Sequence, residues 1–294
     1  MRVWYTAGMK YAIIDIGSNS VRCMHHDGTR CVDKRICTTR LAFGMGQARV
    51  LVQERMQETA QAVEDFYREA VAAGAIVRVF ATAAVRDASN RQDFLNRLSS
   101  RGIAVEVIAG EEEARLGFLG AYTHGTCAVL DIGGGSTEVT IGDSGGIVYA
   151  RSVPVGLSVI YDRCGEDIER SRVWMQEQLQ AFADMPAFDR ALAIGGTATT
   201  FAAMLLRLKT YDRNLTDGCM LDRNAVQELT ERIAAMSLSE REQVAGLHPK
   251  RRDLIVGGGR WMTAWMRLAG VTRLQVRESD NLEGYWLSRF GKGE

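Results

Sequence analysis

Proline and lysine are scarce in this sequence. Proline occurs only at positions 154, 186 and 249, and no low-complexity stretch interrupts the 294 residues, which excludes a long linker between domains. Five of the 36 basic residues are lysine and the rest are arginine. The formal net charge is +0, which argues against a general nucleic-acid binder or a membrane-surface protein, because both usually carry a basic excess.

Paired cysteines and long apolar runs are also missing. No two of the six cysteines are spaced as a zinc site or a dithiol redox site requires, and scattered cysteines suit a reducing cytoplasm. No apolar run approaches the roughly 20 residues that span a bilayer. Asp15 interrupts the only early apolar run, so we predict no signal peptide and a cytoplasmic location. Met9 directly precedes that run and favours a natural start there, with residues 1–8 as an extension.

Hydrophobic periodicity predicts an α/β protein whose architecture is repeated. In the first half we expect strands over 11–15, 20–26, 30–38, 76–81 and 103–108, and helices over 53–73, 91–100 and 111–122. In the second half we expect strands over 127–132, 136–142, 146–153, 191–196 and 273–277, and helices over 169–183, 198–206, 222–235, 250–269 and 281–290. The length suits two domains, 1–124 and 125–280, with a closing helix in 281–294 that packs back on the first.

The two halves open with the same phrase, "IDIGSNS" at 14–20 and "LDIGGGSTE" at 130–138. In each, a buried strand ends in an aspartate and is followed by glycine and small hydroxylated residues. Such a turn can point its backbone N–H groups into an anion-binding nest, and glycine allows close approach of a ligand. The aspartates would repel phosphate unless a divalent cation lay between them. Two such loops predict a phosphate clamp.

Five motifs in order resemble the exopolyphosphatase and guanosine pentaphosphate phosphohydrolase (Ppx/GppA) family. They are "DIGSNSVR" (15–22), "FATAAVRDASN" (80–90), "AGEEEARLGFLGA" (109–121), "LDIGGGSTE" (130–138) and "AIGGTATTFAA" (193–203). The resemblance covers nearly the whole chain. It implies the short two-domain form of an actin-like ATPase superfamily fold. That fold has two actin-like (ribonuclease H-like) domains with a duplicated βββαβαβα core and an interdomain cleft.

The resemblance implies a phosphoanhydride hydrolase. The expected reaction is release of phosphate from the end of inorganic polyphosphate by Mg²⁺-assisted attack of water with a glutamate base, in a homodimer. Guanosine pentaphosphate is the alternative substrate. A non-catalytic polyphosphate or nucleotide sensor, and a kinase of the same fold, are further alternatives. Many relatives carry an additional helical C-terminal region for which this sequence has no room, so we expect weaker processive binding of long chains.

The resemblance also assigns roles to residues. Phosphate-binding positions are Gly17, Ser18, Asn19, Arg22, Arg86, Gly133, Gly134, Gly135, Ser136, Gly195, Gly196 and Thr197. The metal is expected at Asp15, Asp131 and Glu138. In "GEEEAR" the catalytic base is expected at Glu113, with Glu112 in reserve, although acids at a helix start are also common for reasons of helix dipole alone. Glu138 is expected near both metal and water.

Two further stretches stay open at this point. "HPKRRD" at 248–253 is basic and could line the path of a polyanion or form a solvated helix end. "SDNLEG" at 279–284 is close to a late motif of the family but shorter, and its residues carry no expected role.

Overall fold

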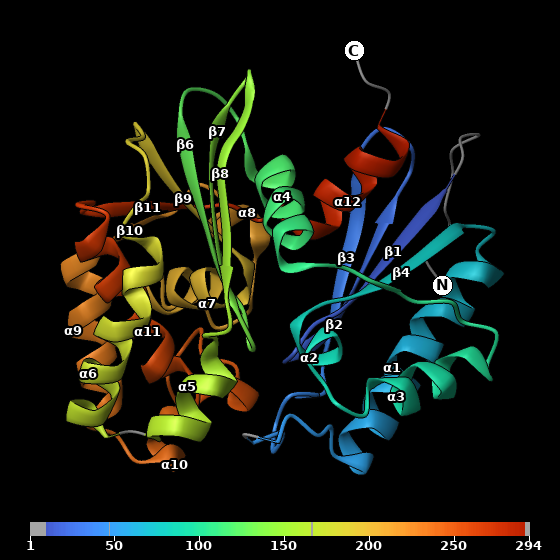
Figure 1. Ribbon diagram of the computed structural model, residues 1–294, viewed down its shortest axis with the longest axis horizontal. Coiled ribbons are helices and arrows are strands. Elements are labelled where there is room, and N and C mark those ends of the chain that lie inside the picture. The colour runs from blue at the N-terminus through green and yellow to red at the C-terminus, as the bar shows by residue number, and fades with distance from the viewer. Residues whose placement is uncertain (1–9, 47, 166, 292–294) are drawn as a thin grey trace. The chain divides into compact units, whose positions relative to one another are not determined.

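The computed structural model describes residues 10–46, 48–165 and 167–291, and it divides into two compact units (Figure 1). The first unit contains the chain up to Ala109 and again from Arg289, and the second contains Gly110–Ser288. The suggested start at Met9 lies outside the described residues. Within the described part of the chain, no helix is long and apolar enough to cross a membrane.

The first unit is built on a five-stranded sheet in the order β3-β2-β1-β4-β5. Its strands are β1 (Tyr11–Ile16), β2 (Ser20–His26), β3 (Cys31–Thr38), β4 (Ile76–Ala81) and β5 (Glu106–Val107). Its helices are α1 (Gln53–Ala72), α2 (Ala83–Arg86) and α3 (Arg91–Ser99). The strands β1 to β3 are antiparallel, whereas β4 runs parallel to β1. Helix α1 packs on the central strands and α3 packs beside it.

Alternation along β1 decides which way its aspartate faces. Ile14 and Ile16 belong to the core under α1. Because successive side chains in a strand point to opposite faces, Asp15 lies on the other face. Its direct neighbour across the ladder is Arg22 of β2.

The second unit repeats this sheet and extends it. The order β8-β7-β6-β9-β11-β10 matches the first sheet strand for strand, with β10 added at one edge. The strands are β6 (Cys127–Ile132), β7 (Thr137–Asp143), β8 (Gly146–Val153), β9 (Arg190–Ile194), β10 (Met220–Asp222) and β11 (Arg273–Val276). The register repeats as well, because Asp131 of β6 faces Glu138 of β7 as Asp15 faces Arg22.

Helices cover both faces of the second sheet. Helix α4 (Gly110–Ala121) packs on β6, β7 and β8, and α7 (Gly195–Leu205) packs on β6 and β9 from the other side (Figure 1). Around α7 lie α5 (Leu157–Cys164), α6 (Ile168–Leu179), α8 (Arg213–Thr216), α9 (Arg223–Ala234), α10 (Leu238–Arg241), α11 (Ile255–Leu268) and the short 3₁₀ helices η1 (Gln180–Phe182) and η2 (Pro249–Arg251). Leu130 and Ile132 join the large core on the α7 side, while Val129 joins the smaller cluster on the α4 side.

The α/β class with a repeated sheet is confirmed, and several boundaries differ from the sequence predictions. The strand expected over 103–108 is paired only at Glu106–Val107, and the strand expected over 191–196 ends at Ile194. The helix expected over 250–269 is two helices, η2 and α11. The break includes Arg252, whose carbonyl oxygen accepts a hydrogen bond from the buried guanidinium of Arg241 at 3.1 Å.

The unit boundary falls at Ala109 and Gly110 rather than at 124 and 125, because α4 packs on the second sheet. The closing helix α12 (Asn281–Phe290) belongs to the second unit as far as Ser288. Its last residues belong to the first unit, where Arg289 binds Glu106 at 2.8 Å and the ring of Phe290 lies 4.6 Å from that of Tyr11.

Candidate active site

The second glycine loop is held by the start of α5. The backbone N–H groups of Leu157 and Ser158 donate to the carbonyl oxygens of Gly133 and Gly134, at 3.0 and 2.8 Å. In a trans peptide the C=O of one residue and the N–H of the next point in opposite directions. The N–H groups of Gly134 and Gly135 therefore point away from α5. This is the arrangement that an anion-binding loop needs.

Close packing fixes this loop further. A side chain at Gly156 would place its Cβ atom 2.4 Å from the carbonyl carbon of Gly134, so the chain before α5 lies directly on the loop. Beyond the loop, the buried hydroxyl of Thr137 donates to the carbonyl oxygen of Val155 and accepts from the indole N–H of Trp261 at 2.8 Å. The loop is thus tied to both α5 and α11.

The first glycine loop has the same internal turn. The N–H of Gly17 donates to the carbonyl oxygen of Ser20 at 3.1 Å, as that of Gly133 does to Ser136 at 2.9 Å. Here the carbonyl oxygens that follow are taken up by residues 40–42: the N–H groups of residues 42 and 40 donate to the carbonyls of Ser18 and Asn19. The side chains of Ser18 and Asn19 are both buried. The duplicated phrase therefore folds as the same turn twice.

Three carboxylates meet on the α4 side of the second sheet. Asp131 shares its face with Val129, and Glu138 shares its face with Thr140, whose hydroxyl donates to the carbonyl oxygen of Ala114 on α4. Glu113 lies one residue before that carbonyl and is 8% exposed. The carboxylates of Glu113 and Asp131 are each close enough to act electrostatically on that of Glu138.

Burial and neighbouring negative charge both disfavour the ionised form of Glu138. Glu138 is 3% exposed, and burial is the largest factor that raises its pKa well above the usual value. The negative charges of Glu113 and then Asp131 raise that pKa further, whereas hydrogen bonds from Ser136 and Ser152 oppose the shift. A cation among these carboxylates, or a proton on Glu138, would relieve the repulsion.

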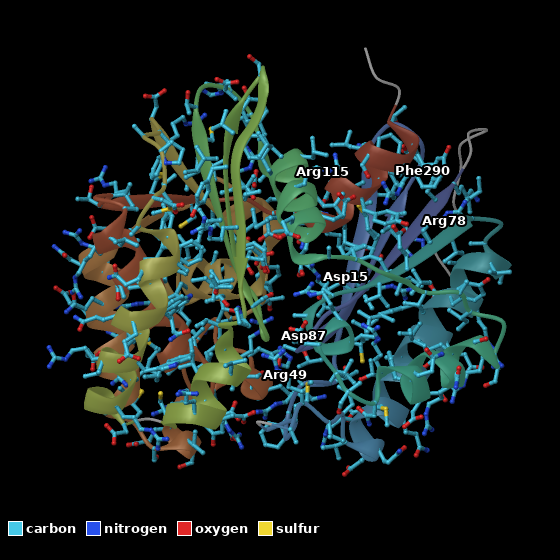
Figure 2. The ribbon with its side chains drawn as sticks, viewed as in Figure 1. Asp15, Arg49, Arg78, Asp87, Arg115 and Phe290 are labelled. Atoms are coloured by element: carbon cyan, nitrogen blue, oxygen red, sulfur yellow. The ribbon has the colours of Figure 1, made fainter. Side chains whose placement is uncertain are left out.

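The three glutamates at the start of α4 have different surroundings. Glu111 is exposed. Glu112 is held by both nitrogens of the Arg115 fork, at 2.8 and 2.9 Å, and Figure 2 shows Arg115 on α4. Glu113 alone is buried, and its charge acts on Glu138. The phase of the helix therefore distinguishes Glu113 from its neighbours.

The third glycine turn meets this carboxylate group at Asp131. Gly195 has a φ of +75°, and a Cβ atom there would lie 2.4 Å from Asp131 Oδ1. Gly195 and Gly196 are the first residues of α7 rather than the end of a strand. The hydroxyl of Thr197 donates to the carbonyl oxygen of Ile132 at 2.7 Å, which fastens the start of α7 to the end of β6.

Arg251 lies at the same turn. A Cβ atom at Gly196 would be 2.1 Å from its Nη2 atom, so the guanidinium rests on the first turn of α7. Sequence reasoning noticed the basic stretch at 248–253 but left its role open. No signal within the basic stretch or the glycine pair could have found this contact, because it joins residues far apart in the sequence.

The two arginines expected to bind phosphate both contact carboxylates in the first unit. Arg22 forms a close ion pair with Asp15, its neighbour across the ladder, and Figure 2 marks Asp15 in the sheet. Arg86 ends α2, lies 3.4 Å from Asp87 and donates to the carbonyl oxygen of Ile108 at 3.3 Å. Their role towards phosphate stays a prediction.

The acids expected to hold a metal fall in both units. Asp131 and Glu138 are in the second and Asp15 is in the first, so this set also stays a prediction. Among residues 10–46, 48–165 and 167–291, no group of three or more acidic, histidine or cysteine side chains has the arrangement of a complete metal site. Mg²⁺ usually takes only one or two protein carboxylates and completes its shell with water and substrate phosphate. The buried Asp131–Glu138 pair fits that chemistry.

Comparison with known proteins gives one family. The model of the Ppx/GppA phosphatase family matches residues 20–281. Exopolyphosphatase 2 of Mycobacterium tuberculosis is 28% identical over 312 residues, covering 97% of this chain and 96% of the relative. Exopolyphosphatase 1 of the same species is 27% identical, covering 91% of this chain and 84% of the relative.

Solved structures agree. The crystal structure of the Aquifex aeolicus member of the Ppx/GppA family is 26% identical, with a TM-score of 0.79 and coverage of 95% of this chain and 97% of that one. That of an exopolyphosphatase-like protein is 26% identical, with a TM-score of 0.88 and coverage of 97% and 99%. The resemblance and the expected enzyme class, a phosphoanhydride hydrolase, are thereby confirmed: the chain belongs to the Ppx/GppA phosphatase family.

Proposed function

We propose that this enzyme is an exopolyphosphatase, which removes the terminal phosphate of inorganic polyphosphate with water. One observation carries the proposal. The buried carboxylates of Glu113, Asp131 and Glu138 lie beside the second glycine loop, whose N–H groups point away from α5. An anion-binding loop next to a buried acid is what attack of water on a phosphate group requires.

The phosphate end would bind to backbone N–H groups and arginine. We assign Gly134 and Gly135 this role, with the Ser136 hydroxyl and the start of α7 from Gly195 to Thr197 beside them. Arg251 adds a guanidinium at that turn, where its fork suits phosphate oxygens. The first unit's loop, Gly17 to Asn19, is proposed to bind phosphate as well, together with Arg22 and Arg86.

Asp131 and Glu138 would hold Mg²⁺, and Asp15 is proposed to assist. The bound ion would supply charge neutralisation for the phosphate oxygens. The protein's own contribution is to keep these carboxylates in place: Glu138 is fixed by Ser152 at 2.6 Å, and Asp131 is pressed against Gly195.

Glu113 would act as the general base. It takes a proton from the attacking water as the new bond from water oxygen to the terminal phosphorus forms. The bond from that phosphorus to the bridging oxygen breaks, and orthophosphate and a polyphosphate shorter by one unit leave. Glu112 is a poorer candidate, because the Arg115 fork holds both of its oxygens and stabilises the carboxylate that would have to accept a proton.

The test is phosphate release by the purified protein from medium-length polyphosphate and, in parallel, from guanosine pentaphosphate, each with Mg²⁺ and with a chelator. We expect metal-dependent release from polyphosphate. Release from the nucleotide alone would make the enzyme a guanosine pentaphosphate phosphohydrolase, and binding without any release would make it a sensor. Light scattering at the assay concentration tests the predicted homodimer.

A further inference from the structure

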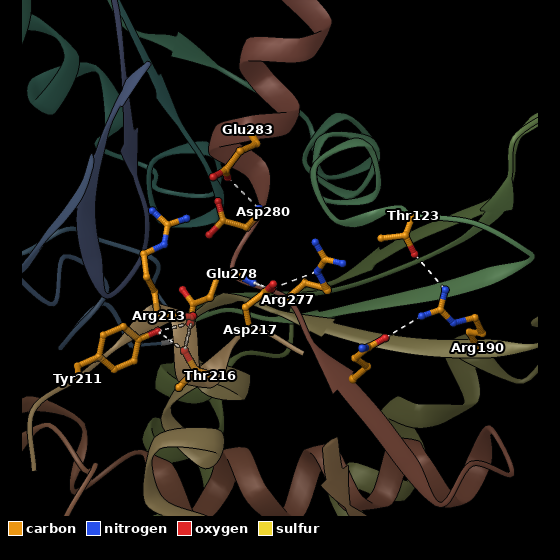
Figure 3. A network of polar contacts seen from close by, with 11 residues as sticks. Thr123, Arg190, Tyr211, Arg213, Thr216, Asp217, Arg277, Glu278, Asp280 and Glu283 are labelled. Atoms are coloured by element: carbon orange, nitrogen blue, oxygen red, sulfur yellow. Dashed lines mark hydrogen bonds and ion pairs between the residues drawn. The ribbon is translucent and has the colours of Figure 1, made fainter. Parts of the chain in front are cut away.

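The motif "SDNLEG" at 279–284 folds as the capped start of α12. The side chain of Glu283 accepts the N–H of Asp280 at 3.0 Å (Figure 3). The side chain of Asp280 accepts the N–H of Leu282, also at 3.0 Å. Together these two bonds cap the helix and stabilise its first turn. Asp280 and Glu283 therefore have a structural role. The side chain of Asn281, between them, takes no part in the cap.

Helix α12 starts directly on the backbone of α4. A Cβ atom at Gly284 would lie 1.8 Å from the carbonyl oxygen of Leu116, and one at Gly120 would lie 2.0 Å from that of Asp280. Only glycine permits this approach, so the two helices cannot shift apart or rotate without losing the contact. The first turn of α12 is thus held against the helix that carries Glu113.

Asn281 is buried at this contact, and its carboxamide oxygen is unusual. Its side chain is 2% exposed, and its carboxamide oxygen has no hydrogen-bond partner among the described residues. That oxygen lies where a side chain at Gly117 would be, 2.8 Å from the position of its Cβ atom. A buried acceptor without a partner costs stability, whereas leucine, of similar shape, would not. Stability alone therefore does not explain an asparagine here.

The position of this oxygen points to the active site. Gly117 follows Glu113 by four residues, so the two lie on the same face of α4. The Cδ1 atom of Ile194 contacts the same spot, 2.9 Å from the position of a Cβ atom at Gly117. Ile194 immediately precedes Gly195, which rests on Asp131. Asn281 therefore reaches the junction between the helix of the base and the turn beside the carboxylates.

We propose that Asn281 is a positioning residue for hydrolysis. Its carboxamide oxygen accepts a hydrogen bond from a buried water on the Glu113 face of α4, and this water belongs to the chain from which the attacking water is drawn. Water is the usual partner of a buried polar atom that the protein leaves unpaired. The inference rests on the proposed function, because it gives Asn281 a role through Glu113.

The test compares Asn281→Leu with Asn224→Leu. Asn224 is an exposed residue in the first turn of α9, another helix capped by an aspartate, and so controls for the same chemical change. For Asn281→Leu we expect a thermal midpoint at or above that of wild type, kcat lower by about 10-fold or more, and an unchanged KM. We expect Asn224→Leu to match wild type in all three.

An unchanged kcat in Asn281→Leu would overturn the inference, and so would a joint fall of kcat and thermal midpoint, which would mark the asparagine as structural. A double variant with Glu113→Gln should be no slower than Glu113→Gln alone, because both changes act on one water; independent losses would contradict this. A crystal structure should show a water about 2.7–3.2 Å from the carboxamide oxygen. That readout separates the two proposals: an inactive wild type refutes the function, and a missing water refutes the role of Asn281.

Discussion

Replacing Gly195 with alanine perturbs the carboxylate group through a single contact. The residue has a φ of +75°, a conformation that costs an alanine about 1–2 kcal/mol. Its new Cβ atom would lie 2.4 Å from Asp131 Oδ1, and ordinary contacts begin near 3.4 Å, so the carboxylate must retreat by about 1 Å. Overpacking of this kind adds about 1–3 kcal/mol. The expected total loss of stability is about 2–5 kcal/mol.

Gly102 provides a matched control. It has the same φ of +75°, but a Cβ atom there would meet nothing within 4 Å. Gly102→Ala should therefore show the backbone cost alone, about 1–2 kcal/mol, and full activity. The difference between the two variants isolates the contact with Asp131.

The assay is urea unfolding of both variants, followed by phosphate release from polyphosphate under conditions where each is folded. A displacement of about 1 Å at a reacting group can lower the rate by about 100-fold, and we expect a loss of that order in Gly195→Ala. Equal stability of the two variants, or full activity of Gly195→Ala, would show that Asp131 does not depend on this contact.

Three further substitutions test the account. Glu138→Gln should stabilise the protein in chelator at pH 7. Because the pKa of Glu138 is raised in the folded state, the ionised side chain destabilises the fold at this pH. That penalty is absent below about pH 4.5, where the side chain is protonated, and it grows as the pH rises. The gain should vanish in unfolding curves near pH 4, and a gain that persists there would contradict the charge explanation. Arg241→Met removes the buried guanidinium that donates to the carbonyl oxygens of Ile233 and Arg252, and loss of these hydrogen bonds should cost about 1–3 kcal/mol in urea; unchanged stability would rule this out. Trp261→Phe removes the bond to Thr137 and should cost about 1 kcal/mol, with unchanged unfolding as the contrary result.

The repeated hairpins could be predicted because the phrase itself is repeated. Each copy combines a buried strand, a glycine turn and an alternating return strand, and both fold with the same register, Asp15 opposite Arg22 and Asp131 opposite Glu138. Local signals of this kind are sufficient where the contacts are between neighbours in the chain.

The details of the site could not be predicted, because they depend on distant contacts. The strand before Asp131 is apolar on both faces, so its sequence does not say which face meets α4. The choice among Glu111, Glu112 and Glu113 depends on the phase of α4 against that sheet. Arg251 reaches Gly196 across 55 positions of sequence, and no pattern within either segment indicates the pairing. The short helices α2, α5, α8 and α10 were missed for a different reason, because four to eight residues carry little periodicity.

The measurement that tests the central claim most directly is the rate of phosphate release from polyphosphate by Glu113→Gln, beside Glu112→Gln, at saturating substrate. Both changes remove one negative charge from the same helix turn, but only Glu113 lies with Asp131 and Glu138, while Glu112 is held by Arg115. We expect Glu113→Gln to lose at least about 100-fold in kcat and Glu112→Gln to stay within a few-fold of wild type. The reverse order, or equal losses, would contradict Glu113 as the base.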